Sequence, residues 1–171
     1  MNIISNNCLS GLLYKNHLNT SYKNPFVWTV IDYNSMSQLI KKWDIINFND
    51  YELEKDNNWL FSIIIEKKIK IQYVHYHFDP MATTLVKYDY CDIKSNNIWE
   101  YITHKYEERI ARMTEAPMFC IMNFSTIFPD AIYTDKQLNE LCKYGNTKVL
   151  KGYEDYTPIE AAKIFYKKVL L

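Results

Sequence analysis

The way the chain begins constrains its fold more than any other feature. A short apolar strand at residues 1–4 runs directly into the polar run Ser5-Asn6-Asn7-Cys8, and residues 9–14 then have the character of a helix. Ligands of open α/β sheets bind where strands end. The sequence therefore predicts a site at the end of this first strand, with a thiol, two carboxamides and a hydroxyl close together.

Strands and helices alternate along the rest of the chain. Buried strands are predicted at residues 26–31, 118–122 and 147–150, and an antiparallel hairpin at residues 59–66 and 69–78. Helices are predicted over residues 97–113 and after three capping residues: Ser35, Thr134 or Asp135, and Thr157. Residues 47–58 and 81–96 read as a loop and an irregular segment. We expect an α/β fold: a single three-layer domain with a mixed, mostly parallel sheet flanked by helices.

Composition sets bounds on size, compartment and partners. The chain has 171 residues, 48% of them hydrophobic, which suits one domain over residues 1–171. Twenty basic and twenty acidic side chains cancel, so we expect no nucleic-acid partner. The four cysteines are scattered, as reduced thiols are. Because no secretory leader and no apolar run long enough for a transmembrane segment occur, a cytoplasmic protein is expected.

Cys8 is the first candidate for chemistry. A thiolate near the start of a helix has a lowered pKa, because the helix dipole favours the anion. As a nucleophile it needs a base, and the amides of Asn6 and Asn7 or nearby backbone N–H groups would then steady an oxyanion. The structural alternative is a small apolar plug at the strand end, with both carboxamides capping the helix or closing a turn.

His75 lies in the second strand of the predicted hairpin. Tyr73, His75 and His77 would share one face of that strand if it alternates regularly. No third ligand accompanies the two histidines, so no metal site is predicted. We expect His75 to act as acid or base toward Cys8, and the alternative is a half-buried histidine bonded to a backbone carbonyl.

Arg109 and Arg112 are the chain's two arginines among twenty basic residues. Three residues along a helix correspond to roughly 300° of rotation, so the two guanidinium groups emerge on one side. Paired arginines suit a phosphate or carboxylate gripped at two points. The alternative is an ion pair with Glu107, Glu108 or a neighbouring carboxylate. Glycine-rich phosphate loops are absent, which disfavours classical nucleotide-cofactor chemistry.

The opening residues resemble a known bacterial family. Ile3-Ile4-Ser5-Asn6-Asn7-Cys8, followed by Gly11, Tyr14 and Asn24-Pro25-Phe26, is similar to the start of a family of unknown function. Its members are labelled exopolysaccharide or capsular polysaccharide biosynthesis proteins. Leu9-Ser10 stands where the family usually has tryptophan and glycine.

Two later marks of that family are also matched. A strand ending in His75-Tyr76 is one, and a helix with Tyr106, Arg109 and Arg112 in the pattern aromatic-x-x-Arg-x-x-Arg is the other. Tyr106 stands where the family usually has tryptophan. Residues 143–149 are similar to a later loop and strand, so the resemblance extends from residue 2 to about 150.

The resemblance implies a transferase of surface-polysaccharide assembly. Asn7-Cys8 also looks like the strand-end pair of some capsule-modifying acyltransferases with a GDSL-type fold, which points to acyl transfer from acyl-CoA to a sugar. Catalysis would use Cys8, His75 and Asn7. Substrate and phosphate binding would use the following residues: Ser5, Asn6, Tyr76, Arg109 and Arg112. Alternatives are a glycosyl- or phosphosugar transferase using a nucleotide-sugar, and a non-catalytic module that binds a glycan or a protein.

Overall fold

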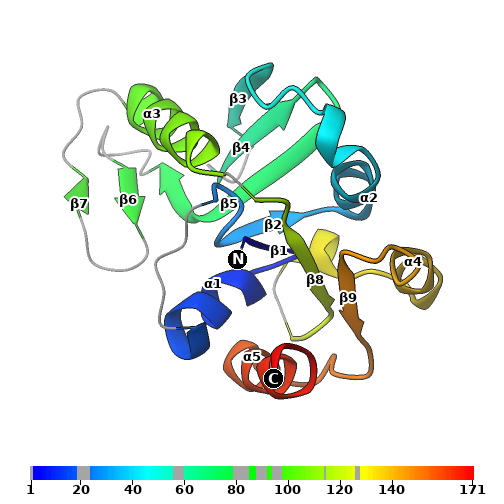
Figure 1. Cartoon of the computed structure of the whole chain (residues 1–171). Helices are drawn as coiled ribbons and strands as arrows, with labels where there is room; N and C mark the ends of the chain where they lie inside the picture. Colours follow the sequence, from blue (N-terminus) through cyan, green and yellow to red (C-terminus); the bar gives the residue numbers. More distant parts are fainter. Residues whose placement is uncertain are drawn as a thin grey trace.

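Two sheets with helices packed around them make up the structure (Figure 1). It is a computed structural model of the whole chain, and it describes residues 2–18, 24–55, 60–78, 85–87, 92–93, 98–113, 115–125 and 128–171. The α/β class predicted from the sequence is confirmed at this level. The three-layer, single-domain organisation stays a prediction.

The smaller sheet is parallel and has three strands in the order β1-β8-β9. They are β1 (Ile3–Ser5), β8 (Met118–Met122) and β9 (Thr147–Leu150). Successive side chains of a strand point to opposite faces, so the sheet contributes to two separate cores. Ile3 packs into the core on the side of α1 (Leu9–Leu13) and α5 (Pro158–Phe165). Ile4 packs on the opposite side, against side chains of the larger sheet.

The larger sheet is antiparallel. It runs β3 (Tyr51–Lys55), β4 (Leu60–Ile65), β5 (Ile69–Phe78), β6 (Leu85–Lys87) and β7 (Asp92–Ile93), and β2 (Thr29–Ile31) pairs with β5. A tight turn joins β4 to β5, with Glu66 and Lys67 both at positive φ, as in the turns that hairpins favour. The predicted hairpin is confirmed, whereas the predicted single, mostly parallel sheet is wrong. Connections this short join antiparallel neighbours.

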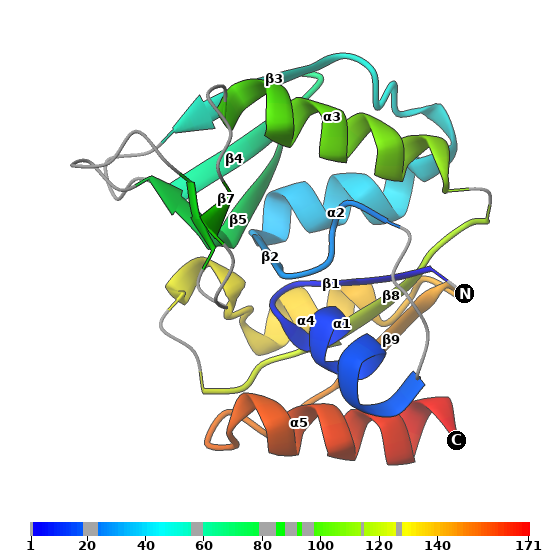
Figure 2. The ribbon, with the colours of Figure 1, turned by 90° about the vertical axis from the view of Figure 1, so that its left-hand side faces the viewer.

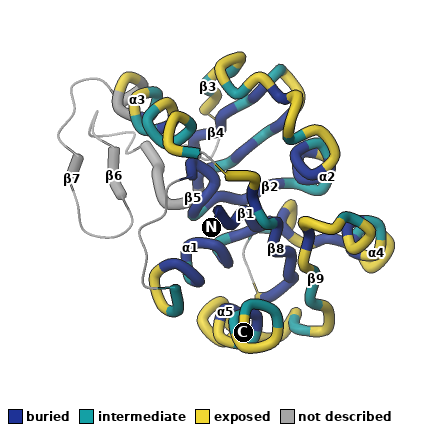
Figure 3. The backbone as a smooth tube through the Cα atoms, viewed as in Figure 1, coloured by how far each residue is buried: buried dark blue, intermediate teal, exposed yellow. Residues whose placement is uncertain are grey.

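Helices cover both faces of the parallel sheet. In Figure 2, α1 and α5 lie side by side below it, and α2 (Tyr33–Lys42) and α3 (Ile98–Ala111) lie above it. Helix α4 (Asp135–Leu141) packs against β9. Both α1 and α5 continue into a π-helical turn, over Tyr14–Leu18 and Tyr166–Leu170. In Figure 3, β1 and β8 are mostly buried, β9 is only partly buried, and the outer faces of α3, α4 and α5 are exposed.

Helix α3 is anchored by tyrosines on the antiparallel sheet. Tyr106 is buried, its hydroxyl donates to the Phe48 carbonyl at 2.9 Å, and its ring lies 4.6 Å from that of Tyr51. Ile102 adds a buried apolar contact one turn earlier. The helix predicted over residues 97–113 is thus confirmed, and its apolar stripe faces the core.

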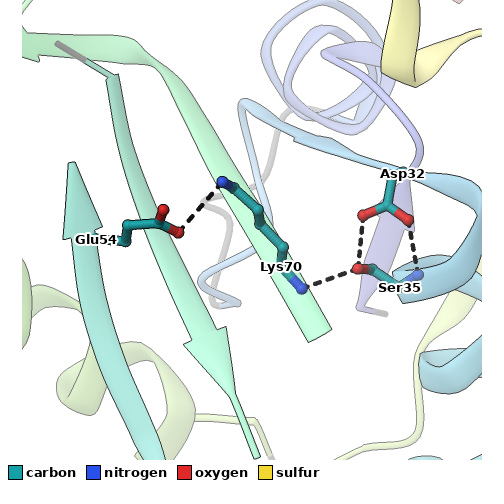
Figure 4. Close-up of polar contacts among 4 residues, drawn as sticks. All are labelled: Asp32, Ser35, Glu54 and Lys70. Atoms are coloured by element: carbon teal, nitrogen blue, oxygen red, sulfur yellow. Dashed lines mark hydrogen bonds and ion pairs between the residues drawn. The ribbon is translucent and has the colours of Figure 1, made fainter. Parts of the chain in front are cut away.

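The cap of α2 differs from the prediction (Figure 4). Asp32 is the capping residue, and its Oδ1 accepts from the backbone N–H groups of Asn34 and Ser35 at 2.8 and 3.1 Å. Ser35 lies inside the helix, donates to Asp32 Oδ2 at 2.7 Å and accepts from the Lys70 backbone N–H at 2.8 Å. The serine therefore ties α2 to β5, and Lys70 reaches across to Glu54 on β3.

Three further segments differ from the sequence reading. Residues 47–58 were predicted as a loop, but β3 forms within them because its five residues pair with residues 61–65 of β4. Strand β2 starts at Thr29 rather than at residue 26, because the preceding residues turn and Trp28 has a φ of 63°. The segment 81–96, predicted as irregular, contains the short strands β6 and β7. Within the described parts of the chain, no helix has the length and apolar character needed to cross a membrane.

Candidate functional site

The end of β1 is where the sequence predicts a site. Ser5 closes the turn that follows: its hydroxyl donates to the Asn7 carbonyl at 2.6 Å and accepts from the Ser10 backbone N–H at 2.9 Å. Ser5 is fully buried. Its hydroxyl therefore links the strand end to the first turn of α1.

Asn6 joins the end of β1 to three other segments. Its Nδ2 donates to the Ala131 carbonyl at 2.7 Å, and its Oδ1 accepts from the Met122 backbone N–H at 3.2 Å. The Asn6 carbonyl accepts from the Ile31 backbone N–H at 3.1 Å, which connects the parallel sheet to β2. This side chain is 0% exposed.

Asn7 is held in the same manner. Its Nδ2 donates to the Met122 carbonyl at 2.8 Å, and its Oδ1 accepts from the Leu9 backbone N–H at 3.1 Å, capping the start of α1. The amides of Asn6 and Asn7 thus donate to backbone carbonyls. This geometry matches the structural alternative for Asn7, whose side chain caps the start of α1, whereas Asn6 bonds to two distant segments.

Cys8 sits at the N-cap position of α1 and is partly exposed. Its side chain packs against the small cluster of Val30 and Ala131, against which Phe128 also packs. Burial among these groups raises the pKa of the thiol from 9.0 to about 11, and its own backbone N–H lowers that pKa only in part. The predicted lowering of the Cys8 pKa is therefore wrong, since desolvation outweighs the short helix that follows.

Asn123 is a site residue that the sequence reading missed. It follows β8 as Asn6 follows β1, and it forms two hydrogen bonds with the backbone of Tyr133: its Nδ2 donates at 2.7 Å and its Oδ1 accepts at 3.0 Å. The Tyr133 hydroxyl donates to the Ile31 carbonyl at 2.6 Å. The sequence signal that could have identified Asn123 is its position directly after a predicted buried strand.

His75 lies in the second half of β5. The partner of Phe61 is Tyr73, but the partner of the preceding Leu60 is His77, so three extra residues are inserted in β5 between these pairs. The shared face predicted for Tyr73, His75 and His77 stays a prediction, because the side chains of both histidines lie outside the described part of the structure. The side chains of His75 and Tyr76 lie outside the described part of the structure.

The two arginines lie at the end of α3, Arg109 in its last turn and Arg112 directly after it. Arg112 pairs with Glu108, which also lies 3.6 Å from Lys105, and the Arg112 side chain is 55% exposed. This is the intrahelical ion pair that the sequence left open as an alternative. Arg109 is partly buried on the preceding turn.

The end of α3 and Cys8 lie at opposite ends of β1. The segment after α3 lies beside the start of β1: Asn2 Nδ2 donates to the Glu115 carbonyl at 3.0 Å, and the Asn2 carbonyl accepts from the Met118 N–H at 2.8 Å. Figure 2 shows α3 ending on that side, whereas Cys8 follows the opposite end of β1. The structure does not bring the arginine pair to the Cys8 end of the sheet, because the parallel strands start where α3 stops.

Neither a search for metal ligands nor comparison with known proteins adds residues to the candidate site. The parts of the chain that the structure describes contain no cluster of three or more His, Cys, Asp or Glu side chains suited to a metal ion. No protein-family model matches the sequence, and no curated protein matches it either. The resemblance to the polysaccharide biosynthesis family stays a prediction.

Proposed function

We propose that the protein is a cytoplasmic transferase of surface-polysaccharide assembly that moves an acyl group from acyl-CoA to a sugar at Cys8. The observation that carries the proposal is a partly exposed thiol on a rigid turn at the end of a parallel strand. Side chains of the three residues before Cys8 hold that turn through backbone hydrogen bonds, so the thiol has a fixed position. The role in surface-polysaccharide assembly is proposed from the family resemblance.

Two steps complete the proposed reaction. The Cys8 sulfur attacks the thioester carbonyl, the CoA sulfur leaves, and the thiol proton passes through His75 to that leaving sulfur. A sugar hydroxyl then attacks the acyl-Cys8 thioester, and its proton returns through His75 to the cysteine. Because the pKa of Cys8 is about 11, the thiol is protonated at neutral pH and a base has to act during the attack.

The oxyanion donor in this proposal is the backbone N–H of Cys8. This N–H favours the anionic form of the Cys8 sulfur, which supports its proposed role toward an oxyanion that forms next to that sulfur. Asn7 and Asn6 then act as positioning residues, because both carboxamides brace the turn.

The test is release of CoA from acetyl-CoA in the presence of sugar acceptors. We expect Cys8→Ala to abolish turnover and His75→Ala to reduce it roughly 10²–10⁴-fold. Cys142→Ala, at the exposed cysteine after α4, is the matched control and should leave turnover unchanged. Intact-mass measurement should show an acetyl adduct on the wild type and none on Cys8→Ala. Wild-type turnover by Cys8→Ala would refute covalent catalysis.

One observation favours a second candidate function. A thiol with a raised pKa is a poor nucleophile without a base, which fits a glycosyl- or phosphosugar transferase in which Cys8 only lines the site. Thermal shifts with acetyl-CoA, nucleotide-sugars and free glycans separate the candidates, since a ligand that binds the folded state raises the melting temperature. Stabilisation by a nucleotide-sugar, together with activity that survives alkylation of Cys8, would favour this second function. Stabilisation by free glycans alone would favour a non-catalytic glycan-binding module.

A further inference from the structure

Tyr156 presents an aromatic ring on the surface at the start of α5. It directly precedes Thr157, the N-cap residue of that helix, and it is 40% exposed. The other tyrosines whose exposure the structure describes are buried or partly buried. Ile159, in the first turn of α5, is 65% exposed. An aromatic and an aliphatic side chain therefore lie in contact with solvent at this helix start.

A second tyrosine supports the Tyr156 ring. The ring centres of Tyr153 and Tyr156 lie 5.3 Å apart, with an angle of 62° between the ring planes. Tyr153 is itself fixed, because its hydroxyl accepts from Lys168 Nζ at 2.7 Å and its side chain packs on the core beside α5. In such an edge-to-face pair, the edge of one ring meets one face of the other. At least one face of the Tyr156 ring is therefore clear of Tyr153.

Backbone hydrogen bonds hold Tyr156 on both sides. Its N–H donates to the Tyr153 carbonyl at 3.1 Å, and its carbonyl accepts from the Ser125 N–H at 3.0 Å. The capping box of Thr157 and Glu160 follows directly. Because the backbone is already ordered, a ligand that packs on this ring pays little of the usual entropic cost of ordering a loop.

Tyr156 lies at the same edge of the parallel sheet as Cys8. Asn7 Nδ2 donates to the carbonyl of Met122, the last residue of β8, and Ser125 follows three residues later. The hydrogen bond from Ser125 thus ties Tyr156 to the edge at which β1 and β8 end. Figure 2 shows α5 beginning on that side of the molecule. This is the edge at which ligands of open α/β sheets bind.

The groups around Tyr156 favour a neutral sugar as the ligand. Glu154 and Asp155 directly precede it and are exposed, so their carboxylates are available to sugar hydroxyls and repel the phosphates of CoA or an anionic membrane. Two apolar side chains cover far less than the roughly 800 Å² per partner that a stable protein interface buries. One pyranose ring is about the size of one tyrosine ring, and its C–H groups pack on an aromatic face.

We propose that Tyr156 is the platform on which a neutral pyranose of the acceptor packs. Ile159 extends its apolar surface, and Glu154 and Asp155 accept hydrogen bonds from the sugar hydroxyls. That this sugar is the acceptor rests on the proposed acyl transfer. The platform and Cys8 share one edge of the sheet, which is the edge where the acyl-Cys8 thioester would form.

Saturation-transfer NMR with N-acetylglucosamine, methyl glucoside and methyl galactoside tests the proposal. We expect at least one of these sugars to bind the wild type through its ring C–H protons, and glucuronic acid to bind more weakly because Glu154 and Asp155 repel its carboxylate. Tyr156→Leu keeps an apolar side chain but removes the ring, and should weaken binding roughly tenfold. Tyr156→Phe keeps the ring and should bind as the wild type does. Ile45→Ala, at a 76% exposed residue after α2, is the control and should also bind normally.

A second measurement uses the wild type alone. The same sugar should slow acetylation of the Tyr156 hydroxyl by N-acetylimidazole, mapped by peptide mass, and should leave acetylation of the partly exposed Tyr144 unchanged. The proposal is overturned if none of the three neutral sugars binds, if Tyr156→Leu binds with wild-type affinity, or if Tyr156 is not protected.

Failure of this proposal is distinguishable from failure of the proposed chemistry. Sugar binding at Tyr156 by a protein whose Cys8→Ala variant keeps full turnover would support the platform and refute covalent catalysis. An acetyl adduct on Cys8 without sugar binding at Tyr156 would support the first chemical step and overturn the platform.

Discussion

Replacing Asn6 by alanine tests how the Cys8 turn is built. The substitution removes a donor to the Ala131 carbonyl at 2.7 Å and an acceptor for the Met122 N–H at 3.2 Å. Asn6 is 0% exposed, so water cannot easily replace either partner. Each buried polar group left without a partner costs about 1–3 kcal/mol. We therefore expect the free energy of unfolding to fall by about 3 kcal/mol.

Urea denaturation followed by far-UV circular dichroism measures this loss. For a chain of this size, about 3 kcal/mol corresponds to roughly 6–12 °C in melting temperature. The urea midpoint should fall by roughly 1–2 M with an unchanged slope. Asn139→Ala, at an exposed asparagine of α4, is the matched control and should stay within about 0.5 kcal/mol of the wild type.

Asn6→Asp sharpens the test. The aspartate keeps the acceptor for Met122 but turns a second oxygen toward the Ala131 carbonyl, so we expect a larger loss at neutral pH. Burial raises the pKa of such a carboxyl. Since the protonated form can donate to Ala131, the loss should shrink as pH falls. If Asn6→Ala unfolds at the wild-type urea midpoint, the side chain does not brace the turn and our explanation of the site is wrong.

Three shorter predictions follow from other contacts. Thr157→Ala removes the capping box of α5 and should cost about 1 kcal/mol in urea unfolding; an unchanged midpoint would mean that the cap contributes nothing. The rate of Cys8 alkylation should increase with pH up to about 11, and at pH 7 it should be lower than the rate at the exposed Cys142. A higher rate at Cys8 than at Cys142 would contradict the raised pKa of Cys8. Hydrogen bonds from the Tyr33 hydroxyl and from Lys41 lower the pKa of Glu140 below its ordinary 4.5. Glu140→Gln should therefore destabilise the protein above pH 4.5, and this loss of stability should vanish as the pH falls through the lowered pKa. A difference in stability that does not change with pH would refute this origin.

Local sequence determined several elements by itself. The predicted start of α5 at Thr157-Pro158-Ile159-Glu160 is confirmed, with both hydrogen bonds of the capping box formed. Thr134 caps α4 in the same way, and the hairpin of β4 and β5 follows from its very short connection. These features depend on residues a few positions apart, so their energetics are visible in the sequence.

Contacts between distant segments decided the partition into two sheets and the roles of the site residues. Asn6 and Asn7 read equally well as catalytic donors or as caps, and only their bonds to residues 122 and 131, more than a hundred positions away, show that they brace the turn. The pKa of Cys8 depends on its burial beside Val30 and Ala131, which no local pattern records. Burial and long-range hydrogen bonding set the chemistry of this strand end, because both are properties of the packed chain.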